Sequence, residues 1–272
     1  MRSSAASDVY KRQYLPVSLL YILSMTLGYV GLRYIELSIS SPICNSSGAL
    51  VAVLCLCTGA LSDYNGPQKA VILCAVGLVC LGVVGLGVVE AREDEDLRRR
   101  RQEHANRKYA KSWLAICLPV AYCLLDAAGT FADNRVIETL TAQAFDSGRF
   151  ATLDECTKQV AASANCAYEL TFLFAAVVCF VYVVLIRRDR LIPKREAPKY
   201  LGAVCETAGQ FAYIYAIADT EHLAMSAPII SSYCAASVLW SRLFLKEKLS
   251  WKHYAMIALV IIGIAIMGVF DL

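Results

Sequence analysis

Charged residues are scarce in this chain of 272 residues, of which 18% are charged and 58% are hydrophobic. Soluble domains carry about a quarter charged residues and about half apolar ones. The hydrophobic residues also occur in continuous blocks that are longer than the strands or helices of a globular core. The composition therefore excludes an ordinary soluble domain, although the length alone would suit one or two of them.

Catalytic and nucleotide-binding motifs are lacking as well. The sequence has no HExxH, no GxSxG and no glycine-rich phosphate-binding loop. Its three histidines, His104, His222 and His253, stand in linkers or at the ends of apolar blocks. Most of the twelve cysteines lie inside those blocks, where cysteine behaves as a small hydrophobic residue. These features argue against an enzyme, an ATP-driven transporter, a cofactor and a metal centre.

Eight apolar runs are long enough to cross a bilayer, whose hydrocarbon core of roughly 30 Å needs about 20 helical residues. The runs are continuous rather than alternating, which excludes barrel strands. We predict transmembrane helices at residues 15–38, 42–61, 69–90, 113–134, 166–186, 199–219, 223–245 and 253–270. The predicted class is an all-α integral membrane protein.

The linkers between these runs alternate in basic charge. Lysine and arginine are concentrated in residues 91–112, 187–199 and 242–253, whereas the loop 135–165 is poor in them. The positive-inside rule places the three basic linkers in the cytoplasm and the loop outside. We interpret the arginine run in the first linker as a topology signal or a patch for membrane lipid, and not as a nucleic-acid site. The predicted location is the cell membrane, of the bacterial cytoplasmic type, with several crossings.

Two similar heptads, SSPICNS at 40–46 and SAPIISS at 226–232, stand at the heads of long apolar runs. They belong to an ungapped match of residues 14–84 with residues 200–270 at a constant shift of 186 positions. Five crossings separate the matched helices, so the two copies would have opposite orientations in the membrane. Inverted repeats of this kind are typical of secondary transporters.

The first copy lacks two helices that the second copy has. Residues 1–13 are polar and include SAASDVYKRQ, which resembles the translation of a sequencing-library adapter. We expect this stretch to be an artefact and the chain to be an N-terminally truncated remnant of a ten-helix protein built as five plus five. The predicted division is a partial first repeat of three helices at 14–90, a basic linker at 91–112 and a second repeat of five helices at 113–272.

The C-terminal segment SAPIISSYCAASVLWSRLFLKEKLSWKHYAMIALVIIGIAIMGVF resembles the last two helices and the hinge of the drug/metabolite transporter superfamily, in its EamA-type branch. The LxE hinge corresponds to Leu245, Lys246 and Glu247. The first copy has LSDYNGPQK where the family often has the hinge glutamate. The resemblance covers residues 14–90 and 113–270. It implies ten helices around a central cavity and the export or exchange of small metabolites.

Polar side chains inside apolar helices are costly, and they usually face the bundle interior or an aqueous path. The candidates for lining a substrate path are Glu206, Gln210, Tyr213, Asp126, Thr130, Asn45, Ser46, Ser231 and Ser232. Helical spacing puts the first three on one face, and Asp126 and Thr130 on another. Pro42 and Pro228 are expected to open the helices beside the heptad serines.

Glu206 is the first candidate for binding a proton or a cationic group of the substrate, and Asp126 is the second. Asp133 continues the spacing of Asp126 but is expected in solvent near the outer end of its helix. Four glycines are expected to serve close helix packing rather than chemistry: Gly77, Gly82, Gly263 and Gly268.

Three functions remain open for such a chain. The favoured one is a secondary transporter that exports or exchanges a small metabolite or drug-like solute by alternating access, with protons as a candidate coupling ion. An intramembrane enzyme with Asp126 and Glu206 as its acid–base pair is the runner-up. A non-functional fragment, or one that needs a partner chain to cover its polar groups, is the third.

Overall fold

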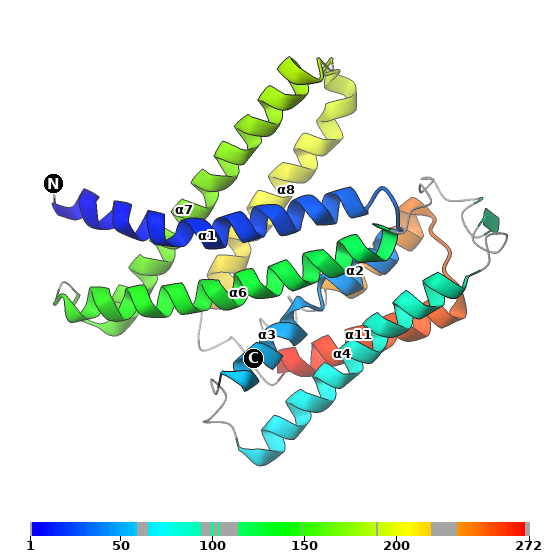
Figure 1. Cartoon of the computed structure of the whole chain (residues 1–272), viewed down its shortest axis with the longest axis horizontal. Coiled ribbons are helices and arrows are strands. Elements are labelled where there is room, and N and C mark those ends of the chain that lie inside the picture. The colour runs from blue at the N-terminus through cyan, green and yellow to red at the C-terminus, as the bar shows by residue number, and fades with distance from the viewer. Residues whose placement is uncertain are drawn as a thin grey trace. The chain divides into compact units, whose positions relative to one another are not determined.

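The computed structural model describes residues 2–58, 65–93, 99–100, 103, 114–148, 150–188, 190–218 and 233–269. Over these residues the chain is helical and has no strand, which confirms the all-α class (Figure 1). In chain order the elements are α1 (Arg2–Gly31), α2 (Leu37–Cys44), α3 (Ser47–Cys57), α4 (Gly66–Arg92), α6 (Leu114–Asp146), α7 (Leu153–Val181), the π-helical turn η1 (Tyr182–Ile186), α8 (Pro193–Ala218), α10 (Tyr233–Trp240), the π-helical turn η2 (Ser241–Leu245) and α11 (Trp251–Val269).

Within the described part of the chain, four helical stretches are long and apolar enough to cross a membrane: Gln13–Gly31, Gly66–Arg92, Leu114–Asp146 and Leu153–Ile186. They overlap the crossings predicted at 15–38, 69–90, 113–134 and 166–186. The first helix ends earlier than predicted, at Gly31, and the last two extend into the residues 135–165 that were predicted to form a loop. Two shorter apolar helices, Tyr233–Leu245 and Trp251–Ile266, coincide with the last two predicted crossings. The chain is therefore a multi-pass membrane protein, while the number of eight crossings stays a prediction.

The second predicted crossing differs from a single helix. Its residues form α2 and α3, with a turn at Asn45 and Ser46 between them. The Asn45 amide donates to the Ser41 carbonyl, and the Ser46 hydroxyl donates to the Ile43 carbonyl. Polar side chains that bond nearby backbone carbonyls in this way compete with helix continuation. Pro42, expected at a helix start, lies inside α2, because α2 begins earlier than predicted, at Leu37.

The chain forms two compact units, each described by itself. Unit 1 comprises Met1–Ile22 and Ala132–Leu223, and unit 2 comprises Leu23–Phe131 and Ala224–Leu272. These units group residues by contact, so the division into sequence repeats remains a prediction.

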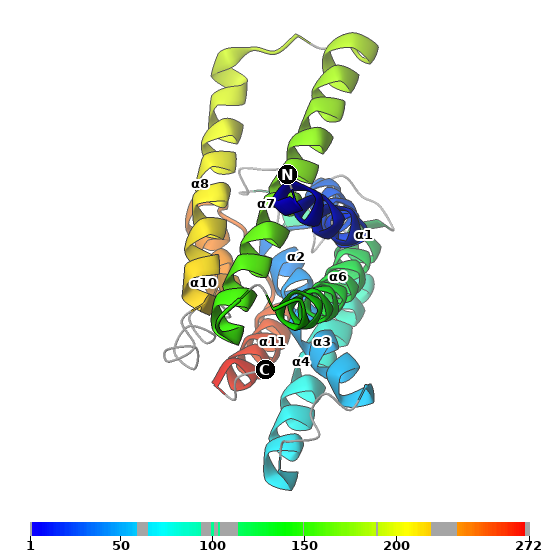
Figure 2. The same ribbon diagram turned by 90° about the vertical axis from the view of Figure 1, so that its left-hand side faces the viewer.

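Unit 1 packs parts of α1 and α6 against α7. Its two apolar clusters hold Tyr14, Val17, Ala164 and Ala167 in one, and Leu140, Ala144, Cys156 and Val160 in the other. Thr152 caps α7 by accepting a hydrogen bond from the backbone N–H of Glu155. After η1 and a short connection, α8 runs back in the opposite direction to α7 (Figure 2).

Unit 2 is built around α4 and α11, which lie side by side (Figure 1). A Cβ added at Gly82 would lie 2.8 Å from the carbonyl oxygen of Met256, and one at Gly263 would lie 2.7 Å from that of Ala75. Rising numbers in one helix meet falling numbers in the other, so the pair is antiparallel. Because a Cβ would collide with backbone at both points, only glycine permits this approach, as predicted for these two positions. Gly77 differs, since no described atom lies within 4 Å of its Cβ position.

Candidate functional site

The break between α2 and α3 gathers polar side chains in unit 2. Ser46, which is 3% exposed, places its hydroxyl oxygen 3.4 Å from the Cys123 sulfur of α6. One turn further along α6, the Asp126 carboxylate accepts a hydrogen bond from the Ser47 hydroxyl at the start of α3. The N-terminal end of a helix carries a partial positive charge, which stabilises an anion there. The Asp126 carboxylate therefore lies at the N-terminal end of α3, where the helix resumes.

A second chain of hydrogen bonds extends the break toward α10. The Ser237 hydroxyl of α10 donates to the Ser41 hydroxyl of α2 at 2.6 Å. The Asn45 amide donates to the same Ser41 oxygen at 3.2 Å. We call the whole set the α2–α3 cluster; its members are Ser41, Asn45, Ser46, Ser47, Cys123, Asp126 and Ser237. It joins four helices through polar contacts at the place where one helix is interrupted.

The hinge glutamate, Glu247, caps the N-terminal end of α2. The Glu247 carboxylate accepts hydrogen bonds from the backbone N–H groups of Leu37 and Ser38 at 3.2 and 3.1 Å, and from the Ser38 hydroxyl at 2.6 Å. Its side chain is buried, with 2% of the residue exposed. The first N–H groups of a helix lack partners within the helix. Glu36 holds the N-cap position but makes no side-chain cap, so Glu247 supplies the cap from the far end of the chain.

Three of the predicted path residues meet in the α2–α3 cluster: Asn45, Ser46 and Asp126. Thr130, on the same helix as Asp126, is exposed. Glu206 lies on α8 in unit 1 and is exposed there. The remaining candidates lie beyond what the structure describes, because the side chains of Gln210 and Tyr213 on α8, and the residues Pro228, Ser231 and Ser232, are outside the described set.

Asp133 has surroundings that differ from the solvent exposure expected for it. Its carboxylate accepts hydrogen bonds from the hydroxyls of Tyr14 and Tyr21 of α1, all within unit 1. The Tyr21 ring meets the Tyr168 ring edge to face, with centroids 5.7 Å apart. The expectation of a solvated side chain was wrong, because the two tyrosines come from a helix whose packing the sequence did not reveal.

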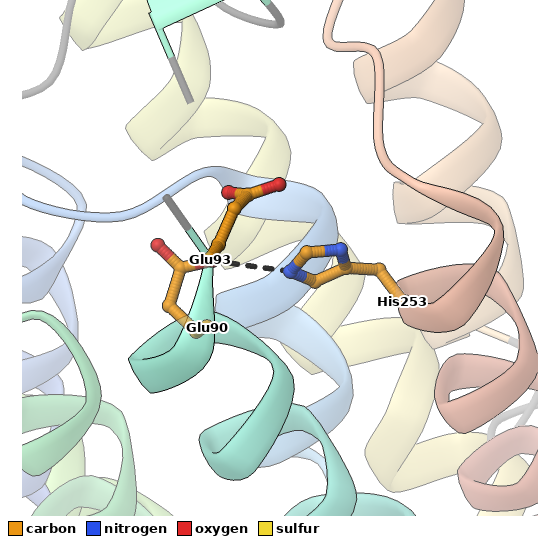
Figure 3. A group of neighbouring side chains, drawn as sticks. All are labelled: Glu90, Glu93 and His253. Atoms are coloured by element: carbon orange, nitrogen blue, oxygen red, sulfur yellow. Dashed lines mark hydrogen bonds and ion pairs between the residues drawn. The ribbon is translucent and has the colours of Figure 1, made fainter. Parts of the chain in front are cut away.

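A third polar group lies where the C-terminal end of α4 meets the N-terminal end of α11 (Figure 3). The His253 Nε2 atom lies 3.1 Å from a carboxylate oxygen of Glu90, and its Nδ1 atom lies 2.7 Å from the Ser250 hydroxyl. Glu93 offers a further carboxylate, and one ligand atom from each of Glu90, Glu93 and His253 lies within 4.8 Å of the others. No local sequence pattern predicts this group, since 163 positions separate Glu90 from His253.

Comparison with known proteins supports one family. The model of the EamA-like transporter family matches residues 159–269, a segment that runs from within α7 to the end of α11 and includes Glu247. A search of curated proteins and a search of solved structures give no match to the chain. The family match confirms the resemblance to the EamA-type branch of the drug/metabolite transporter superfamily, and it indicates a membrane transporter of small solutes.

Proposed function

We propose that this EamA-type chain is a secondary transporter that exports or exchanges a small polar or cationic solute by alternating access, and that the α2–α3 cluster lines its path. One observation carries the proposal: the second predicted crossing is interrupted at Asn45 and Ser46, next to the carboxylate of Asp126. The cell membrane of a bacterium, with the basic linkers on the cytoplasmic side, is the proposed location.

An interruption of a helix within the membrane leaves backbone polar groups that need other partners. Non-helical backbone is tolerated there only where it is buried in protein or lines a water-filled cavity. Secondary transporters place their substrate and ion sites at such interruptions, where helix ends and freed backbone groups face the bound species. In this chain the interruption is surrounded by hydroxyl, amide and carboxylate groups, which can exchange their mutual hydrogen bonds for bonds to a polar solute.

Asp126 is the residue best placed to bind a proton or the cationic group of a solute. Its carboxylate is partly buried and touches the first residue of α3. An ionisable group within a transmembrane segment is a functional candidate by default, because its burial costs free energy. Glu206 remains the second carboxylate of the proposal, on the separate helix α8.

The pairing of α4 with α11 supports the inverted-repeat part of the proposal. The two helices hold corresponding places in the two predicted copies, and they run antiparallel, as an inverted arrangement requires. The contacts of Glu247 with α2, and of Ser237 with Ser41, join the two copies around the same interruption. The family match also favours transport over intramembrane catalysis.

The test is transport by the full chain reconstituted into proteoliposomes with an imposed pH gradient. A mixture of radiolabelled amino acids and the fluorescent cation ethidium serve as probes, and a pH-sensitive dye inside the vesicles reports proton movement. We expect gradient-driven solute movement by the wild type and at least a tenfold loss in Asp126→Asn. Asp146→Asn, at the exposed end of the same helix, is the matched control and should transport normally.

Two results would contradict the proposal. One is a wild-type chain that moves neither protons nor any probe. The other is an Asp126→Asn variant with the rate and the pH coupling of the wild type, which would leave Asp126 as a cap of α3 only.

A further inference from the structure

We propose that Glu90, Glu93 and His253 form a binding site for a divalent transition-metal ion, of which Zn²⁺ is the representative. The site lies at one end of the α4–α11 pair in unit 2, and it does not depend on which solute the chain transports. The proposal rests on the ligand geometry, on the support of the histidine ring and on the chemistry of the three side chains.

The distances between the possible ligand atoms suit a bound metal ion. Ligand atoms about 2 Å from a tetrahedral Zn²⁺ ion lie roughly 3.3 Å from one another. The His253 Nε2 atom and the Glu90 carboxylate oxygen are already 3.1 Å apart. Glu93 completes a set whose ligand atoms all lie within 4.8 Å of one another. Glu93 is partly exposed and stands at the C-cap of α4.

The imidazole ring of His253 is held in place by a hydrogen bond to Ser250. A histidine that binds a metal through one nitrogen almost always holds its other nitrogen in a hydrogen bond, which sets the tautomer and the ring orientation. The Ser250 hydroxyl lies 2.7 Å from Nδ1 of His253. The ring is fully buried and the Glu90 side chain is 5% exposed. Nε2 is therefore held toward the two carboxylates, as Figure 3 shows.

The two carboxylates lie at the negative end of the α4 helix dipole. The C-terminal end of a helix carries a partial negative charge, which stabilises a cation bound there. Glu90 belongs to the last turn of α4 and Glu93 is its C-cap residue. Arg92 is also in this last turn, and its side chain is exposed. A divalent ion between the carboxylates would neutralise both of them at the negative end of the dipole.

The ligand set selects the class of ion. One imidazole and two carboxylates suit Zn²⁺ and related first-row ions, whereas Mg²⁺ and Ca²⁺ prefer oxygen ligands alone. Three protein ligands also leave a position open to water. Since Glu90 comes from α4 and His253 from α11, a bound ion would cross-link these two helices at one end.

The test measures Zn²⁺ alone, with no transported solute, so its result is independent of the proposed function. The full chain is purified in detergent, its accessible cysteines are alkylated to remove thiolate sites, and Zn²⁺ binding is followed by titration calorimetry. We expect one saturable site in the wild type, at least tenfold weaker binding in Glu93→Gln, and a loss of 10- to 100-fold in Ser250→Ala. Glu138→Gln, a change at an exposed glutamate of α6, is the control and should bind as the wild type does.

Thermal unfolding provides the second readout and also checks the folding of each variant. Zn²⁺ should raise the melting temperature of the wild type and of Glu138→Gln, and Mg²⁺ should not. Co²⁺ in the same site should show ligand-field bands without a thiolate charge-transfer band. The proposal is overturned if the alkylated wild type has no saturable site, or if a folded Glu93→Gln variant binds Zn²⁺ as tightly as the wild type. In either case Glu90 and His253 form a hydrogen-bonded pair only.

Discussion

The α4–α11 pair and the α2–α3 segment are both apolar regions of unit 2, but they meet the demands of a membrane interior differently. In the pair, both helices are continuous, and glycines let their backbones touch. In the segment, serine and asparagine side chains bond to carbonyls, the helix stops and starts again, and a carboxylate lies beside the gap. The comparison separates a region built for close packing from one built for polar contact.

The largest expected effect comes from filling the close contact of the pair. Gly82→Leu would drive a side chain into the Met256 carbonyl and Val260, so the helices must separate. Overpacking of this kind costs about 1–3 kcal/mol, and more where backbone is the obstacle. We expect a loss of about 3 kcal/mol in the free energy of unfolding, seen as a lower melting temperature in detergent. Gly77→Leu is the matched control, and equal losses in both variants would show that the contact is not what the glycine serves.

The next effect concerns the cap of α2. Glu247→Ala would leave the N–H groups of Leu37 and Ser38 without their acceptor, and each such buried group costs about 1–3 kcal/mol. We expect a loss of about 2–3 kcal/mol in the free energy of unfolding, with Glu247→Gln losing less because its amide oxygen still accepts. Glu138→Ala, at an exposed position of α6, should change little. If Glu247→Ala melts at the temperature of the wild type, the cap does not stabilise the protein.

The smallest effect is expected within the interruption. Ser46→Ala removes a hydroxyl that bonds the Ile43 carbonyl and faces Cys123. One hydrogen bond contributes about 1 kcal/mol net, so stability should fall by about that amount. Transport should fall more than stability if the cluster lines the path. The melting temperature and the transport rate of this variant together distinguish a packing role from a role in lining the path. Ser163→Ala on α7, a partly exposed serine that donates to the Gln159 carbonyl, is the control.

Much of the fold followed from patterns that are local in the sequence. The apolar runs around residues 69–90 and 166–186 predicted helices that the structure contains, because length and hydropathy alone decide what can cross a bilayer. The interruption at Asn45 was not predicted, although the local signal was present. A serine- and asparagine-rich turn after a proline was interpreted as a helix start, whereas the side chains end one helix before the next begins.

The candidate site divides in the same way. The sequence by itself determined the all-helical membrane class, the resemblance of its C-terminal part to the EamA-like transporter family and the polar residues worth considering, since these depend on composition, spacing and a contiguous C-terminal motif. Only the tertiary structure decided which of them meet. Asp126 accepts a hydrogen bond from Ser47, and Glu247 caps α2. Asp133 accepts hydrogen bonds from two tyrosines, and His253 lies within hydrogen-bonding distance of Glu90. Each of these contacts joins segments that are far apart in the sequence, and the packing of the helices, not local sequence, brings such residues within hydrogen-bonding distance.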